Sequence, residues 1–238
     1  MACVSENIIA NIVIPSPDKD LGLGAAIFPG GGYQLIAPAE AAPIADWLAS
    51  VGVAAAVIDY PVGERHPRPF DAAMDALRDV RARPEFSGRR FGVVGFSAGA
   101  QLAGMCCHPG AFGREEPRPD FAVFGYPLIS MDADTHEGSM VTLLGPDADE
   151  QTRERFSVDR LVDAGTPPSF VWQTAEDASV PVINSLRYAT ACARAGVPIE
   201  LHVFAHGPHA LGLAQGAYAE PWTALCQRWL RDQAGLSA

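Results

Sequence analysis

Residues 91–105 read FGVVGFSAGAQLAGM and give the strongest indication of the fold. It begins as an apolar run, passes through Gly95-Phe96-Ser97-Ala98-Gly99 and continues as small residues. A continuous apolar run is typical of a strand covered on both faces, and G-x-S-x-G between a strand and a helix is typical of a sharp turn that exposes a serine hydroxyl. Glycines suit the turn because side chains at Gly95 and Gly99 would collide with the neighbouring strand and helix. The stretch predicts Ser97 as a nucleophile, with a purely structural turn as the alternative.

Short apolar runs and longer helical periods alternate on both sides of this unit, which predicts β-α-β units, a mostly parallel twisted sheet and flanking helices. The predicted strands are Asn7–Ile14, Leu23–Phe28, Ala54–Asp59, Arg90–Phe96, Phe121–Tyr126, Ser169–Gln173 and Glu200–Phe204. The predicted helices are Ala39–Ser50, Phe70–Arg83, Ala98–His108, Val182–Ala195 and Tyr218–Asp232. No linker or repeat divides the chain, so we expect residues 1–238 to form one domain. Leu128–Pro168 is predicted to be a long irregular connection, and such connections often carry function.

Three consecutive glycines follow the second predicted strand in the sequence IFPGGGY, residues 27–33. Ordering such a run is costly, and backbone N–H groups without a Cβ beside them can donate to a developing oxyanion. We therefore expect Gly31, Gly32 and Ala98 to form an oxyanion hole. The alternatives are a flexible loop and a phosphate-binding loop, but the G-K-[ST] signature of the latter is missing.

The general base is expected just after the last predicted strand, where His206 and His209 lie in the sequence Ala205-His206-Gly207-Pro208-His209. The Gly-Pro pair makes a tight turn that presents His209 towards the serine, so His209 is the prediction and His206 the rival. His202 lies inside a predicted strand, which favours a packing role.

The acid that orients the histidine is expected after the preceding strand, and Asp177 stands there. Its neighbour Glu176 is the obvious rival, and Asp163 is a weaker one. The chain order serine, acid, histidine suits a carboxylate that accepts from the Nδ1–H of His209.

The sequence resembles the bacterial acetyl-xylan esterase-like branch of the α/β-hydrolase superfamily of serine hydrolases. The resemblance runs through FPGGGY (28–33), GVVGFSAGAQLAG (92–104), YPLIS (126–130), SMVTLLG (139–145), the long block at 166–204, and GPHALGLA (207–214). It implies an α/β-hydrolase fold, with Ser97, Asp177 and His209 as catalytic residues. We expect no large cap domain in this chain, in which it departs from the family. One departure is Ala100-Gln101, where the family often has Gly-His; Gln101 would then alter the leaving-group side.

The expected reaction is two-step hydrolysis of short-chain acyl esters, of which acetyl esters of sugars or xylo-oligosaccharides come first. Feruloyl and other small aromatic esters or lactones are the alternative, followed by peptide hydrolysis and a non-catalytic role. This chemistry requires neither a metal nor an organic cofactor. The apolar residues of Leu128–Pro168 are too few to line a deep acyl tunnel, so we expect a preference for short acyl chains.

A formal net charge of −11 argues against nucleic acid and membrane surfaces as partners, because both are anionic. A small ester is the expected binding partner, and the sequence leaves a homo-oligomer open. The beginning of the chain lacks a signal-peptide pattern. The five cysteines have no metal-ligand or redox spacing, which favours reduced thiols and a cytoplasmic location.

Overall fold

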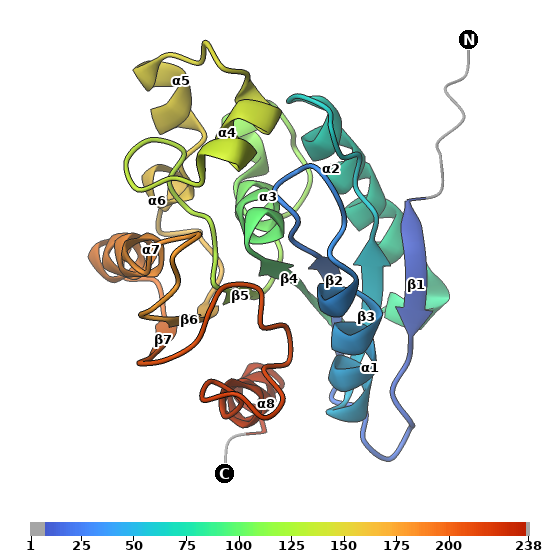
Figure 1. The fold of residues 1–238 in the computed structure, drawn as a ribbon. Coiled ribbons are helices and arrows are strands. Elements are labelled where there is room, and N and C mark those ends of the chain that lie inside the picture. Colours follow the sequence, from blue (N-terminus) through green and yellow to red (C-terminus); the bar gives the residue numbers. More distant parts are fainter. Residues whose placement is uncertain (1–7, 237–238) are drawn as a thin grey trace, which may run out of the picture.

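The computed structural model of the protein describes residues 8–236, and its centre is a seven-stranded sheet in the order β1-β3-β2-β4-β5-β6-β7 (Figure 1). Among the strands of residues 8–236, only the β1–β3 pair is antiparallel. The strands are β1 (Ile9–Val13), β2 (Leu23–Phe28), β3 (Val53–Ile58), β4 (Arg90–Phe96), β5 (Ala122–Gly125), β6 (Ser169–Thr174) and β7 (Ile199–Phe204). This arrangement confirms the predicted mostly parallel sheet. Of the predicted first strand, Asn7 lies outside the described residues.

Helices cover both faces of the sheet, and each face has its own apolar core. The longer helices are α1 (Ala42–Ser50), α2 (Arg68–Arg81), α3 (Ala98–Cys106), α7 (Ile183–Ala195) and α8 (Trp222–Gln233). One core joins alternate strand residues such as Ala26 and Phe28 to α2, α3 and α7. The other joins Ala25 and Ile27 to α1 and α8. Burial on both faces explains why the central strands read as continuous apolar runs. Within residues 8–236, none of the helices has the length and apolar character needed to cross a bilayer.

Two predicted helix starts are wrong by three residues or more. The helix predicted from Ala39 begins at Ala42, after a separate 3₁₀ turn at Pro38–Glu40. The helix predicted from Tyr218 begins at Trp222, directly after Pro221. Proline has no backbone N–H, and the N–H groups of the first turn of a helix have no intrahelical acceptor. A proline is therefore tolerated there and often marks the start of a helix.

The predicted irregular connection Leu128–Pro168 contains three short helices: α4 (Glu137–Leu144), α5 (Glu150–Arg155) and α6 (Val158–Leu161). They lie together at one end of the molecule, in yellow and gold in Figure 1. Side chains cap two of them, since His136 accepts from the Ser139 N–H and Asp149 from the Thr152 N–H. Helices this short carry too few periodic positions for a sequence pattern to reveal them.

Candidate active site

Ser97 lies in the turn between β4 and α3, where its backbone has the strained values φ 52° and ψ −123°. The Ser97 N–H donates to the Gly125 carbonyl at 3.1 Å, which ties the turn to the neighbouring strand. A Cβ added to Gly99 would lie 2.1 Å from the Phe28 carbonyl oxygen, and one added to Gly95 would lie 2.5 Å from the Ala100 Cα. Both glycines are therefore required by close backbone approaches, as the sequence predicts.

His209 lies between Ser97 and Asp177 and bonds to both. Its Nε2 is 2.8 Å from Ser97 Oγ, and its Nδ1 is 2.6 Å from Asp177 Oδ2. An ionised carboxylate only accepts, so the shared hydrogen belongs to Nδ1 and the Nε2 lone pair faces the serine hydroxyl. In this tautomer His209 can take the hydroxyl proton. The structure thus brings together the three residues that the sequence placed far apart.

Asp177 lies just beyond β6, and its carboxylate accepts hydrogen bonds from four donors. Its Oδ1 accepts from the backbone N–H groups of Ser179 at 3.0 Å and Val180 at 2.9 Å. Its Oδ2 accepts from Gln173 Nε2 at 3.3 Å as well as from His209. Burial acts to raise the pKa of the carboxyl, but the His209 bond and the two amides outweigh it and lower the pKa of Asp177 overall. The side chain therefore stays an anion that fixes the His209 ring.

The rival residues lie elsewhere. Exposed His206 pairs with exposed Glu176 at 2.9 Å, so these two neighbours of the predicted residues bond to one another. His202 bonds to Glu200 at 2.7 Å within β7. Asp163 forms an ion pair with Arg118.

The glycine loop lies directly against the serine. A Cβ on Gly30 would be 2.9 Å from Ser97 Cβ, and the next two glycines have positive φ, 125° at Gly31 and 68° at Gly32. Within residues 8–236, the N–H groups of Gly31, Gly32 and Ala98 have no protein acceptor. Unpaired donors beside the Ser97 hydroxyl could serve a developing oxyanion in an acyl-transfer reaction.

The expectation that Gln101 would face the leaving group is wrong. Its side chain is fully buried. It accepts from the Tyr33 hydroxyl and donates to the Phe156 carbonyl oxygen at 2.9 Å. Gln101 therefore joins the glycine loop to the α5–α6 connection behind the site.

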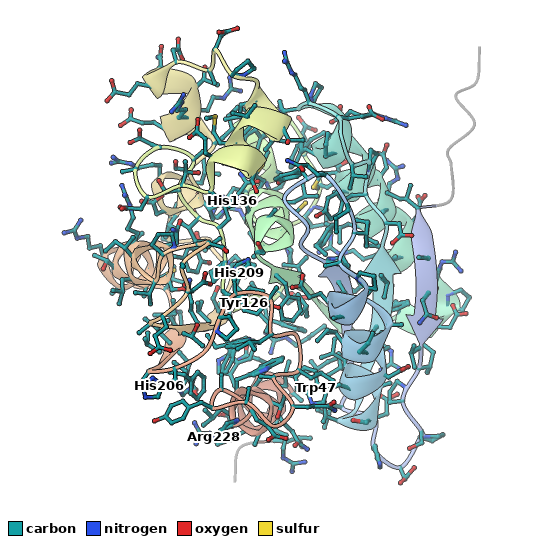
Figure 2. All side chains as sticks on the ribbon, in the orientation of Figure 1. Trp47, Tyr126, His136, His206, His209 and Arg228 are labelled. Atoms are coloured by element: carbon teal, nitrogen blue, oxygen red, sulfur yellow. The ribbon has the colours of Figure 1, made fainter. Side chains whose placement is uncertain are left out.

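Three residues beside the site were not expected from the sequence. The Tyr126 ring packs edge to face on His209 with centroids 4.9 Å apart, and the buried Glu40 carboxylate bonds to Tyr126. His136 begins α4, with its Cε1 3.8 Å from the position of a Cβ on Gly32. Figure 2 shows Tyr126 next to His209, with His136 on the side towards α4. A glutamate in the stretch APAEAAP gives no sequence signal of its burial, because the partners are far away in the chain.

The sheet, the strained serine turn and the serine–histidine–aspartate arrangement define an α/β-hydrolase. The sequence profile of the prolyl oligopeptidase family matches residues 44–237, and the chain belongs to this family.

The similar proteins differ in how much of their own length this chain covers. An acetyl ester-xyloside bifunctional hydrolase from Caldicellulosiruptor lactoaceticus is 40% identical, with a TM-score of 0.86 over 95% of this chain and 89% of that one. A carboxylesterase from Lactobacillus plantarum is 27% identical, with a TM-score of 0.77 over 98% and 97% of the two chains. An acetylxylan esterase from Xylanibacter ruminicola is 30% identical over 220 residues, which cover 88% of this chain and 45% of that protein. The chain spans less than half the length of the curated relatives it matches.

Proposed function

We propose that this protein is a serine carboxylesterase that hydrolyses short acyl esters, with acetyl esters of sugars or xylo-oligosaccharides as the first substrate class. The observation that carries the proposal is the contact of His209 Nε2 with Ser97 Oγ at 2.8 Å, together with the Asp177 carboxylate behind the ring. This geometry suits removal of the serine proton by a neutral imidazole. The similarity to an acetyl ester-xyloside hydrolase over 89% of its chain supports the substrate class.

The reaction proceeds in two acyl-transfer steps. Ser97 Oγ attacks the ester carbonyl carbon while His209 Nε2 takes the hydroxyl proton, and Asp177 stabilises the imidazolium that forms. The N–H groups of Gly31, Gly32 and Ala98 donate to the carbonyl oxygen as it becomes negative. The bond to the alcohol then breaks, and the alcohol leaves with the proton from His209.

Water completes the cycle. His209 removes a proton from the water as its oxygen attacks the acyl carbon of the Ser97 ester. Collapse of the second tetrahedral intermediate breaks the bond to Ser97 Oγ, which regains its proton from His209. The products are the free acid and the regenerated enzyme, and every proton is accounted for without a metal or an organic cofactor.

The proposed site lies in one domain, which we take to be the whole chain. We further propose a cytoplasmic location, because Cys106, Cys107, Cys192 and Cys226 are buried and unpaired, as is typical in reducing compartments. Cys3 lies outside the described residues. Size-exclusion chromatography with light scattering decides between a monomer and a homo-oligomer.

A fluorophosphonate probe followed by a substrate screen tests the function. The wild-type protein should label at Ser97, and Ser97→Ala should neither label nor turn over, with kcat lower by about three orders of magnitude or more. The screen compares acetylated xylo-oligosaccharides and p-nitrophenyl acetate with feruloyl esters and a prolyl peptide amide. Preferred cleavage of the feruloyl ester or the peptide would replace the proposed substrate class, and a folded Ser97→Ala protein with wild-type turnover would overturn the mechanism.

A further inference from the structure

A buried carboxylate that the mechanism above does not use lies behind the site. Glu40 ends the 3₁₀ turn at Pro38–Glu40 and is 2% exposed. Its Oε2 accepts from the Gly30 N–H at 2.6 Å, and its Oε1 accepts from the Tyr126 hydroxyl at 2.7 Å. Burying a carboxylate is costly unless donors compensate, so each of these bonds contributes to holding the backbone in place.

The first bond fixes the glycine loop. Gly30 immediately precedes the expected oxyanion donors, and a Cβ there would lie 2.9 Å from Ser97 Cβ and 2.7 Å from Glu40 Oε2. Gly30 therefore lies between the Glu40 carboxylate and Ser97 and is in close contact with both.

The second bond reaches the histidine. Tyr126 Oη accepts from the Gly212 N–H at 2.9 Å, and Gly212 follows His209 in the same loop. The Tyr126 ring itself packs on the His209 ring with an interplanar angle of 69°. Figure 2 shows the two residues side by side. One carboxylate thus anchors both the oxyanion loop and the histidine loop.

The hydrogen bonds of Glu40 are those expected of an ionised carboxylate. Both of its oxygens accept, and the Gly212 N–H occupies Tyr126 Oη as a donor, which leaves the phenolic hydrogen for Glu40. Burial raises the pKa of Glu40 overall, although the Tyr126 and Gly30 bonds and the nearby His209 act in the opposite direction. The titratable groups that face His209 are Asp177, Glu40, Tyr126 and His136.

We propose that Glu40 is a positioning residue of the esterase site, which holds the oxyanion loop through Gly30 and the histidine through Tyr126 and supplies a second buried negative charge that stabilises the His209 imidazolium. The inference rests on the proposed function. Asp177 then acts on the His209 ring by a direct hydrogen bond to Nδ1. Glu40 acts through the electrostatic field of its carboxylate, which is bonded to the Tyr126 hydroxyl. Negative charge near an imidazole favours its protonated form.

Glu40→Gln removes the charge and keeps the size and shape of the side chain. The amide oxygen can still accept from Gly30, but the amide nitrogen is a donor, so the Tyr126 hydroxyl loses its carboxylate acceptor and can only accept from the new side chain. Removal of the charge should lower kcat/KM for p-nitrophenyl acetate by about tenfold. It should also move the acid limb of the kcat/KM profile to lower pH by about 0.5 unit or more, since His209 loses a favourable partner for its protonated form. Glu176→Gln is the matched control, because that carboxylate is exposed and pairs with His206; it should leave both quantities unchanged.

NMR titration of the His209 imidazole, assigned by its loss in His209→Gln, reports the same shift without turnover. A wild-type protein without ester turnover would overturn the proposed function and leave this titration intact, so the two failures are distinguishable. An unchanged His209 titration in folded Glu40→Gln would overturn the inference. Where Glu40→Gln does not fold, Tyr126→Phe keeps the ring and the Glu40 carboxylate but removes the hydroxyl that bonds to both Glu40 and Gly212. A kcat/KM at the wild-type level in that variant would equally overturn the inference.

Discussion

Asp177→Asn is the substitution whose effect the structure predicts in most detail. The aspartate Oδ1 accepts from two backbone N–H groups, those of Ser179 and Val180, while Oδ2 accepts from Gln173 and His209. An asparagine must place its oxygen on one side and its NH₂ group on the other. Leaving a buried N–H without an acceptor costs about 1–3 kcal/mol, so the oxygen stays with the two backbone groups.

This choice places the NH₂ group against His209 Nδ1. Two donors cannot share a hydrogen bond, so the imidazole moves its hydrogen to Nε2, which then faces Ser97 Oγ and cannot accept a proton. The site keeps its shape but loses its base. The equivalent loss in serine proteases lowers kcat by about 10⁴, which corresponds to about 5 kcal/mol in the activation free energy. We expect a decrease of about 10³–10⁴ here, by the same tautomer change.

The assay is the initial rate with p-nitrophenyl acetate at neutral pH, with circular dichroism to show that Asp177→Asn is folded. Glu176→Gln is the control, since it removes the adjacent carboxylate, which bonds to His206 rather than to His209. Glu176→Gln should retain activity close to wild type. An Asp177→Asn rate above about a tenth of the wild-type rate, or a larger loss of rate in Glu176→Gln, would contradict the predicted tautomer change.

Four further predictions follow from the site and the core. His209→Ala should lower kcat about as much as Ser97→Ala because the residues act as a unit, whereas His206→Ala should be mild; the reverse order of the measured rates would move the base to His206. In a p-nitrophenyl series below micelle formation, kcat/KM should fall from acetyl to octanoyl, since Met131, Met140, Leu143 and Phe156 of the long connection are buried in the core and each methylene adds about 0.8 kcal/mol only where it is buried; a rise with chain length would reveal an acyl channel. Gly99→Ala should lower the free energy of unfolding by about 1–3 kcal/mol in urea, because its Cβ would meet the Phe28 carbonyl, while Gly110→Ala, with open space around it, should not. Burial lowers the pKa of His108, so the unfolded chain binds more protons than the folded one as the pH falls below about 6.5, and stability should decline there; His108→Gln should show a smaller fall in Tm between pH 7 and pH 5.5, and an equal fall would contradict this source of acid sensitivity.

Local patterns were sufficient for the parts of the fold in which each segment carries its own signal. The apolar run before Ser97 predicted β4, since a strand buried on both faces has no polar positions to interrupt it. The glycines at 95 and 99 predicted the turn because no other residue fits its backbone approaches. Parallel strands end at the same edge of a sheet, so residues that follow β6 and β7 were expected near Ser97, and Asp177 and His209 do lie there.

Contacts between distant segments were decided by the tertiary structure alone. The sequence offered Glu176 and Asp177 side by side, and only the direction of the chain after β6 turns one carboxylate to His209 and the other to His206. Gln101 looked like a substrate-facing residue until packing gave it Tyr33 and Phe156 as partners.

Glu40 is the clearest case of a residue whose partners the sequence could not predict. Its partner Tyr126 is 86 residues away, and a lone glutamate in the alanine- and proline-rich stretch APAEAAP is expected to be solvated. Amphipathic period and turn chemistry describe neighbours along the chain, and they determined the strands, the serine turn and the order of the expected triad. The partners of a buried polar group depend instead on which segments the closed core brings together, and this is why the link from Glu40 to both loops of the site becomes visible only in three dimensions.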